Sequence, residues 1–230
     1  MNKKTAKDTL KLLAQSHGAP LFGVCRIDSL HENFHAELQD VSAALNTAIS
    51  IGVPVSASVL DSIIDHPTVL YKTHYRQINH TLNDIAFLIS SQIENSGFHA
   101  IPIPASQIIS WKPMRAHLSH REIAYKAGLG WWGRNNLLVN RKYGSQVRLV
   151  TVLTDLELQP DSPTDDDCGD CYDCLKSCPA GAIFKDKKDF RLDRCYRLVS
   201  EFARPKRIGT LICGLCLKAC KGDKSISAAL

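Results

Sequence analysis

Long apolar runs are missing from this sequence, and their absence excludes a conventional membrane-spanning helix. No run among its 230 residues approaches the roughly 18 apolar residues that such a helix needs. The first residues lead into an amphipathic pattern rather than an apolar segment, so no export signal is expected. Internal repeats are also missing, apart from two related cysteine motifs near the C-terminus.

A strong charge of either sign is missing as well. The chain has 28 basic and 23 acidic residues, which leaves a formal net charge of +5. A charge this modest does not by itself mark a nucleic-acid-binding protein, although it suits docking to an acidic partner. Apolar residues make up 44% of the chain, which is enough for one substantial domain and a small one.

Cysteine is the residue type that the sequence does have, and its spacing is specific. Four cysteines and a proline follow the pattern C-x2-C-x2-C-x3-C-P, which is the bacterial ferredoxin motif for [4Fe-4S] clusters. Two-residue gaps in a tight turn present three sulfurs to one cubane, and the fourth cysteine points towards a second cluster. The proline has a fixed φ and no N–H, so it defines the exit of the turn. These residues are Cys168, Cys171, Cys174, Cys178 and Pro179.

A second motif downstream supplies the partner cluster. It reads C-x2-C-x3-C and is one cysteine short, and Cys195 provides the missing ligand from a distance. We predict that the first cluster is held by Cys168, Cys171, Cys174 and Cys220. We predict that the second cluster is held by Cys178, Cys195, Cys213 and Cys216.

Zinc and disulfides are the alternative explanations of these cysteines. Paired C-x2-C units bind zinc in many proteins, but a zinc site has no use for the third cysteine of the first motif. Disulfides suit small secreted domains, whereas this chain has an odd number of cysteines, nine. Thiolates in cluster motifs fit a reducing compartment, and we therefore expect a cytoplasmic protein.

Hydrophobic periodicity predicts alternating helices and strands before the cysteines. Helices are expected over residues 4–17, 68–96 and 119–127, and a short one after residue 56. Strands are expected over residues 20–27, 46–55, 98–103 and 147–154. The third long helix begins with a capping box, Ser119 to Glu122, and Gly97 is expected to end the second. Cys25, alone in the first strand, is expected to be a core residue.

This order of elements favours an α/β or α+β sandwich. An acidic stretch with two prolines, residues 156–167, is typical of a linker. We therefore divide the chain into an α/β cofactor or substrate domain over residues 1–157 and a double-cluster, ferredoxin-like domain over residues 158–230.

A glycine-rich loop between the two parts matches G-x-G-x-x-G from Gly128 to Gly133. That motif indicates dinucleotide binding only where a strand precedes it and a helix follows, and here the order is reversed. We therefore reject a dinucleotide site. Trp131 and Trp132 in this loop either form aromatic walls for a planar cofactor or pack the two domains together.

The loop also carries a resemblance to a known family. The residues from Ala127 to Val139, AGLGWWGRNNLLV, together with the cysteine motifs and the remote Cys195, resemble the epoxyqueuosine reductase family and its wider kin, the reductive dehalogenases. The resemblance implies a nitroreductase-like, corrinoid-binding domain fed with electrons by a two-cluster ferredoxin-like domain. It implies that cobalamin lies near Gly130, Trp131, Gly133, Asn135 and Asn136.

The sequence departs from the family pattern at several places. Arg134 stands where lysine is usual, and residues 106–115 lack the acid expected to donate a proton. The sequence ends at Leu230, so we expect a short branch without the C-terminal helical repeats, and tRNA is a doubtful partner. His117 and His120 are weak candidates for the proton carrier, although ordinary local hydrogen bonding explains each of them better. Ser106 is a weaker candidate still.

Two hypotheses of different classes follow. The first is an iron-sulfur reductase that relays electrons through two [4Fe-4S] clusters to a bound cofactor, a corrinoid by resemblance. The second is a ferredoxin-type electron carrier, or a reductive activator of a separate corrinoid protein, with no substrate of its own. Either function requires a redox partner protein as electron donor. In the second, Arg204 to Arg207 is a docking patch rather than a solvated loop.

Overall fold

The computed structural model describes residues 3–111 and 114–222, which form two compact units. Each unit gathers segments that are far apart in the sequence. Unit 1 comprises Met1–Val53, Ile78–Leu129 and Arg148–Thr164, and unit 2 comprises Pro54–Gln77, Gly130–Val147 and Asp165–Leu230. The predicted functional division at residues 157 and 158 stays a prediction.

A four-stranded sheet is the centre of unit 1. Its strand order is β1 (Leu21–Arg26), β2 (Thr47–Pro54), β8 (Val147–Thr154) and β3 (Ala100–Ile103). The outer pairs, β1 with β2 and β3 with β8, are antiparallel, with Val24 opposite Ile49 and Ile101 opposite Leu153. The central strands β2 and β8 are almost continuously apolar and buried, as expected for strands covered on both faces.

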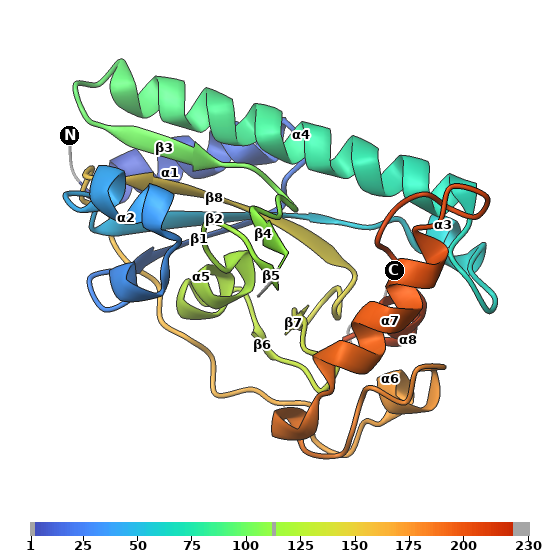
Figure 1. Ribbon diagram of the computed structural model, residues 1–230. Coiled ribbons are helices and arrows are strands. Elements are labelled where there is room, and N and C mark those ends of the chain that lie inside the picture. The colour runs from blue at the N-terminus through green and yellow to red at the C-terminus, as the bar shows by residue number, and fades with distance from the viewer. Residues whose placement is uncertain (1–2, 112–113, 223–230) are drawn as a thin grey trace. The chain divides into compact units, whose positions relative to one another are not determined.

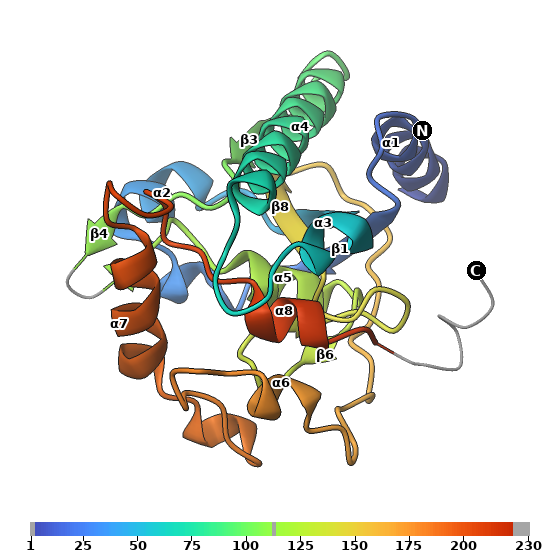
Figure 2. The same cartoon turned by 90° about the vertical axis from the view of Figure 1, so that its right-hand side faces the viewer.

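Helices cover both faces of this sheet. In Figures 1 and 2, α1 (Lys3–Ser16) and α4 (Val69–Glu94) lie on one side, and α5 (His120–Lys126) lies on the other. Residues of β1 contact α5 at every second position, because successive side chains of a strand point to opposite faces of the sheet. Gly23 faces α5 so closely that a β-carbon there would lie 2.3 Å from the carbonyl oxygen of Ala127. Cys25 is buried on the same face, as predicted, 3.7 Å from the carbonyl oxygen of Ile123.

The α5 side of the sheet carries a continuous apolar core. The chain after β1 passes through a short 3-10 helix, η1 (His31–Asn33), and then α2 (Ala36–Ser42), and both contribute to this core. Its buried members are Cys25, Ile27, Leu30, Phe34, Leu38, Leu45, Ala48, Ile103, Leu118, Ile123, Ala127 and Leu153.

The predicted long elements of unit 1 are confirmed to within a few residues. Gly97 follows α4 with a φ of 85°, a left-handed conformation that favours glycine after a helix. The Ser119 side chain accepts a hydrogen bond from the Glu122 amide and caps α5. The sequence did not predict α2 or the small hairpin of β4 (Ser110–Trp111) and β5 (Met114–Arg115), because both are too short for periodicity to show.

Unit 2 consists of short elements joined by loops. It contains α3 (Ala57–Asp61), the N-terminal half of α4, and a two-stranded ribbon of β6 (Trp131–Trp132) with β7 (Leu138–Val139). The cysteine region adds α6 (Asp173–Lys176), η2 (Lys187–Asp189), α7 (Leu192–Phe202) and α8 (Leu215–Ala219). Helices α6 and α8 pack together, and Lys218 of α8 donates hydrogen bonds to the carbonyl oxygens of Asp61 and Ile63 at 3.3 and 2.7 Å.

No helix within the described residues is both long enough and apolar enough to cross a bilayer.

Candidate functional site

The glycine-rich loop leads from a helix into the β6–β7 ribbon, which confirms the predicted order of elements. Gly128 follows α5 with a φ of 71°. A β-carbon on Gly130 would lie 2.0 Å from the carbonyl oxygen of Val139, so the ribbon closes only with glycine at that position. A β-carbon on Gly133 would lie 2.5 Å from a methyl group of the Val139 side chain. These glycines therefore allow close backbone packing within the ribbon.

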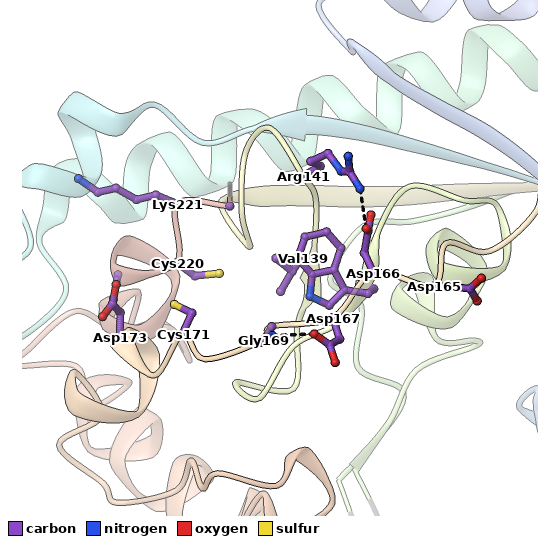
Figure 3. Close-up of a pocket in the computed structure, with 14 residues that line it drawn as sticks. Val139, Arg141, Asp165, Asp166, Asp167, Gly169, Cys171, Asp173, Cys220 and Lys221 are labelled. Atoms are coloured by element: carbon purple, nitrogen blue, oxygen red, sulfur yellow. Dashed lines mark hydrogen bonds and ion pairs between the residues drawn. The ribbon is translucent and has the colours of Figure 1, made fainter. Parts of the chain in front are cut away.

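A cavity of about 560 Å³ in unit 2 brings the ribbon beside three of the cysteines predicted to hold the first cluster. In Figure 3 the sulfur atoms of Cys171 and Cys220 lie side by side on one wall of this first cavity, with Asp167 and Asp166 on the opposite side. Asp166 pairs with Arg141 at 2.5 Å. The lining residues are Trp131, Val139, Arg141, Asp165, Asp166, Asp167, Cys168, Gly169, Cys171, Asp173, Ala219, Cys220, Lys221 and Gly222.

A second cavity of about 40 Å³ is surrounded by all four cysteines predicted for the second cluster. Its wall is almost entirely apolar, and α7 contributes Cys195, Leu198 and Val199 to it. A small, dry space lined by thiols favours a metal-sulfur centre over a hydrated ion. The lining residues are Asn135, Cys178, Pro179, Ala180, Ala182, Ile183, Phe190, Cys195, Leu198, Val199, Cys213, Leu215 and Cys216.

The thiols influence one another in the same two groups. Burial first, and then the neighbouring Cys220, Cys168 and Cys171, raise the pKa of Cys174 to about 11. We name these four the first cysteine set. Burial, followed by Cys213 and Cys178, raises the pKa of Cys195 to about 11.

Cys178, Cys195, Cys213 and Cys216 are named the second cysteine set. Burial first, and then the other three members of this set, raise the pKa of Cys216 well above the usual value. Cys174 of the first set adds a smaller effect on the same thiol. The two sets are therefore neighbours within unit 2.

Local backbone features hold the cysteines in place. Gly214 has a φ of 88°, and a β-carbon there would lie 2.6 Å from Ile63 and 2.8 Å from Tyr71, so only glycine fits between Cys213 and α8. A β-carbon on Gly144 would likewise lie 2.0 Å from the carbonyl oxygen of Cys220.

Ser145 and Asn135 form a buried polar link beside the cysteines. The Asn135 side-chain amide donates a hydrogen bond to the Ser145 hydroxyl at 2.9 Å, and both residues are buried. Burial raises the pKa of the Cys220 thiol, and hydrogen bonding from Ser145 opposes that rise. Sequence reasoning missed Ser145, because a lone serine in a loop belongs to no recognisable motif.

Arg134 fastens the ribbon to the first cysteine motif. Its guanidinium donates hydrogen bonds to the carbonyl oxygens of Gly169 at 2.8 Å, Cys171 at 3.1 Å and Lys185 at 2.6 Å. It also lies over the Tyr172 ring, 4.6 Å from the ring centroid. A lysine has a single donor group at its tip and cannot reproduce this fork, so arginine at this position has a specific structural role.

The residues that the resemblance assigned to cobalamin are divided between several places. Trp131 lines the first cavity, it is 8% exposed, and its indole N–H has no hydrogen-bond partner. Asn135 lines the second cavity instead. Gly130 and Gly133 shape the ribbon, and Asn136 adopts a left-handed turn with a φ of 58°. Their assignment to a cofactor stays a prediction.

The candidate proton carriers, His117, His120 and Ser106, all lie in unit 1. His120 Nδ1 lies 2.8 Å from the Thr151 hydroxyl and Nε2 lies 3.1 Å from the Pro104 carbonyl oxygen. Burial, as the largest cause, lowers its pKa to about 4, so the ring is neutral near pH 7. His117 lies 3.6 Å from the Glu37 carboxylate, and the Ser106 hydroxyl accepts a hydrogen bond from the Arg148 guanidinium. A catalytic role for any of them stays a prediction.

Metal-sulfur clusters and single ions require different arrangements of the cysteines. Across residues 3–111 and 114–222, no three His, Cys, Asp or Glu side chains converge closely enough to hold one ion. Zinc would draw its sulfurs to within about 4 Å of one another, because each Zn–S bond is about 2.3 Å long. A four-iron cluster is larger than an ion and needs thiols spread around a space. Its positive iron would also stabilise the thiolates that burial disfavours here.

Solved structures with the same fold include reductive dehalogenases and epoxyqueuosine reductases. The chain matches the catabolic reductive dehalogenase NpRdhA in complex with 3-bromo-4-hydroxybenzoic acid, with a TM-score of 0.76 and 18% identity, over 96% of this chain and 33% of that one. Another structure of a reductive dehalogenase with the same score is described as suggesting a B12-dependent mechanism. The mixed α/β class with antiparallel sheets is thereby confirmed.

The particular resemblance to epoxyqueuosine reductases is also confirmed. An epoxyqueuosine reductase solved with an epoxyqueuosine-modified tRNA stem loop matches with a TM-score of 0.64 and 20% identity, over 95% of this chain and 65% of that one. The epoxyqueuosine reductase of Salmonella typhimurium is 32% identical over 155 residues, and that of Listeria monocytogenes is 42% identical over 71 residues. The stem-loop complex conflicts with the expectation that tRNA is a doubtful partner.

The chain spans only part of these relatives. The aligned segments cover 37% of the Salmonella protein and 19% of the Listeria protein, and 66% and 31% of this chain. No family model matches the chain.

Replacing Arg134 with glutamine is expected to loosen the first cysteine motif. The variant loses three hydrogen bonds to carbonyl oxygens, and we expect unit 2 to be destabilised by about 1–2 kcal/mol. Alkylation of Cys171 in the reduced, metal-free protein should accelerate at least fivefold, measured by mass spectrometry. Arg26→Gln, which removes an exposed arginine paired with Asp28, is the control and should leave Cys171 unaffected. Equal alkylation rates in the Arg134 variant and the parent would contradict this role.

Acid is expected to destabilise the protein through His120. Its folded pKa, about 4, lies below the ordinary value of 6.5, so the unfolded chain binds the proton first as the pH falls. The contribution of the neutral ring is complete above pH 6.5 and is lost towards pH 4, by up to about 3 kcal/mol. Thermal unfolding of His120→Asn between pH 7 and 4.5 should show a shallower loss than the parent. An unchanged pH slope would show that His120 is not its source.

Proposed function

We propose that this protein is a reductase in which two [4Fe-4S] clusters relay electrons to a corrinoid held in the first cavity. The observation that carries the proposal is the arrangement of eight cysteines in two adjacent sets, one of which opens onto a cavity of about 560 Å³. Small-molecule and cofactor sites typically measure 300–1,000 Å³. A relay ending at a cavity of that size fits an enzyme that reduces something bound there.

The first set would hold one cluster at the cavity wall, and the second set would hold the other behind it. Cys168, Cys171, Cys174 and Cys220 therefore serve the cluster next to the cofactor, and Cys178, Cys195, Cys213 and Cys216 serve the cluster that receives electrons first. The cysteine region is in this view a ferredoxin-like module, the proposed domain over residues 158–230. The residues before it form a nitroreductase-like domain, the proposed domain over residues 1–157.

The first cavity has features that suit a flat, amphipathic cofactor. Trp131 offers an aromatic wall and an indole N–H without a partner, which an acceptor on the cofactor would satisfy. Val139 adds apolar contact, and charged side chains of both signs, among them the Arg141–Asp166 pair and Lys221, would meet the amide groups at the edge of the cofactor. A bound corrinoid would supply a cobalt centre that becomes a strong nucleophile and reductant when reduced. The chain itself would bind it, exclude water and set its distance from the first cluster.

The relatives suggest two substrate classes for such an enzyme. Those with the same fold include a dehalogenase bound to a halogenated hydroxybenzoic acid and a reductase bound to a modified tRNA stem loop. The higher sequence identity is with the epoxyqueuosine reductases. We therefore propose a modified tRNA as the first substrate to test, in spite of the departures from the family pattern.

An electron carrier or reductive activator is the second candidate. The observation that favours it is the lack of any acidic residue over residues 106–115, where a proton donor is expected. In that case the reduced clusters would deliver electrons to a corrinoid on another protein.

Anaerobic titration of the reconstituted protein with cob(II)alamin separates these functions. A corrinoid reductase should convert the cobalt EPR spectrum to a base-off form at one equivalent. Trp131→Ala should weaken that binding at least tenfold, because it removes the wall of the first cavity. Trp132→Ala is the matched control, since Trp132 lies outside that cavity. An unchanged cobalt spectrum beside two reducible clusters would favour the electron carrier.

Replacing Cys195 with alanine tests the assignment of the clusters. We expect the reconstituted variant to lose half of its iron, with one cluster EPR signal gone and the other retained. Cys25→Ala is the matched control, because Cys25 is buried in unit 1 away from both sets and should leave the iron content unchanged. Retention of both signals in the Cys195 variant would remove that residue from the ligand set.

A further inference from the structure

We infer that the exposed basic surface formed by residues 181–207 docks an acidic one-electron donor protein and delivers its electrons to the second cysteine set. This inference rests on the proposed function, because it assumes that the second set holds a redox cluster. It adds the place of electron entry and the chemistry of the partner.

Charge is concentrated in this segment. It holds nine lysines and arginines and four acids, a surplus of five that equals the surplus of the whole chain. All nine basic side chains are exposed. The basic residues are Lys185, Lys187, Lys188, Arg191, Arg194, Arg197, Arg204, Lys206 and Arg207.

The neighbouring segment has the opposite charge. Residues 165–180, which carry most of the first cysteine set, contain five aspartates and a single lysine. Lys185 and Lys187 lie near Cys168 of the first set, whereas the arginines of α7 lie beside Cys195 of the second. The basic side chains of α7 therefore attract an acidic partner to the second set, where electrons would enter.

The basic surface also covers the second cavity directly. Helix α7 turns Cys195, Leu198 and Val199 towards that cavity, while Arg194 and Arg197, on either side of Cys195 in the sequence, stay exposed. A donor bound to the outer face of α7 would thus be separated from the second set by one helix. Electron transfer weakens steeply with distance, so this is the side on which a donor gains most from binding.

The surface has the composition of a protein interface. Leu192 and Tyr196 are 50% and 37% exposed and lie one helical turn apart on α7, among the arginines. Tyrosine and arginine are enriched at the energetic centres of interfaces. Arg191 and Arg194 lie over the Phe184 ring at 5.9 and 5.8 Å from its centroid, and Arg194 donates a hydrogen bond to the Gly181 carbonyl oxygen at 3.0 Å. Side chains ordered in advance lose less entropy when a partner binds.

Nucleic acid is the other polyanion that such a surface attracts. A phosphate backbone gains nothing from proximity to a redox centre, whereas a donor protein requires it. The coincidence of the basic residues with the wall of the second cavity therefore favours the donor.

Stopped-flow reduction tests the inference, with a reduced, acidic plant-type [2Fe-2S] ferredoxin as the probe and the fully reconstituted protein as the acceptor. The rate constant for cluster reduction should fall at least tenfold between low and high salt, because ions screen the attraction. Lys187→Glu with Arg197→Glu and Arg207→Glu should lower the rate at low salt at least tenfold. Reduction by dithionite, and the iron content, should remain at the parent level.

A matched variant separates the surface from the overall charge. Lys4→Glu with Lys11→Glu and Arg115→Glu makes the same change of charge on exposed residues of unit 1, and should slow the ferredoxin reaction less than threefold. Equal slowing by both variants, or none by the first, would overturn the inference. Weaker binding of a tRNA stem loop with normal ferredoxin reduction would also overturn it and assign the surface to nucleic acid. Failure of dithionite to reduce any cluster would instead overturn the proposed function.

Discussion

Gathering eight thiols at two neighbouring places is the constraint around which unit 2 is built. Burial and mutual repulsion raise the pKa values of five of these thiols, so a positive centre between them would favour their ionised form. The surrounding chain is accordingly short elements and tight turns with glycine at the closest approaches, rather than a sheet with its own core. The stability of this unit and its capacity to bind clusters are therefore one property.

Unit 1 is organised around an apolar core. Its sheet is covered on both faces, and apolar strands such as β2 and β8 supply the core without help from any ligand. The three candidate proton carriers belong to this unit, where His120 and Ser106 take part in structural hydrogen bonds and His117 lies beside the Glu37 carboxylate. The chemistry that this chain can offer is thus concentrated in thiols, in one tryptophan and in charged side chains around them.

Sequence alone predicted the parts of the protein that depend on local pattern. Periodicity located α1, α4, α5 and the long strands, and the assignment of the cysteines to two clusters stays a prediction. Local sequence patterns could not predict that each unit combines segments far apart in the chain, because that arrangement depends on contacts between distant residues. The sequence also did not predict the hydrogen bonds from Arg134 to three carbonyl oxygens or the close approach of Gly130 to Val139. Both involve backbone atoms, which are the same in every residue.

The link from Asn135 through Ser145 to Cys220 has a consequence for how such a centre is adjusted. Asn135 forms part of the wall around the second cysteine set, and Ser145 hydrogen-bonds to a thiol of the first. A dipole that turns towards one set turns away from the other, because both share the same two side chains. A substitution at Asn135 or Ser145 therefore changes the polar surroundings of both sets at once and, with clusters bound there as proposed, would shift both potentials.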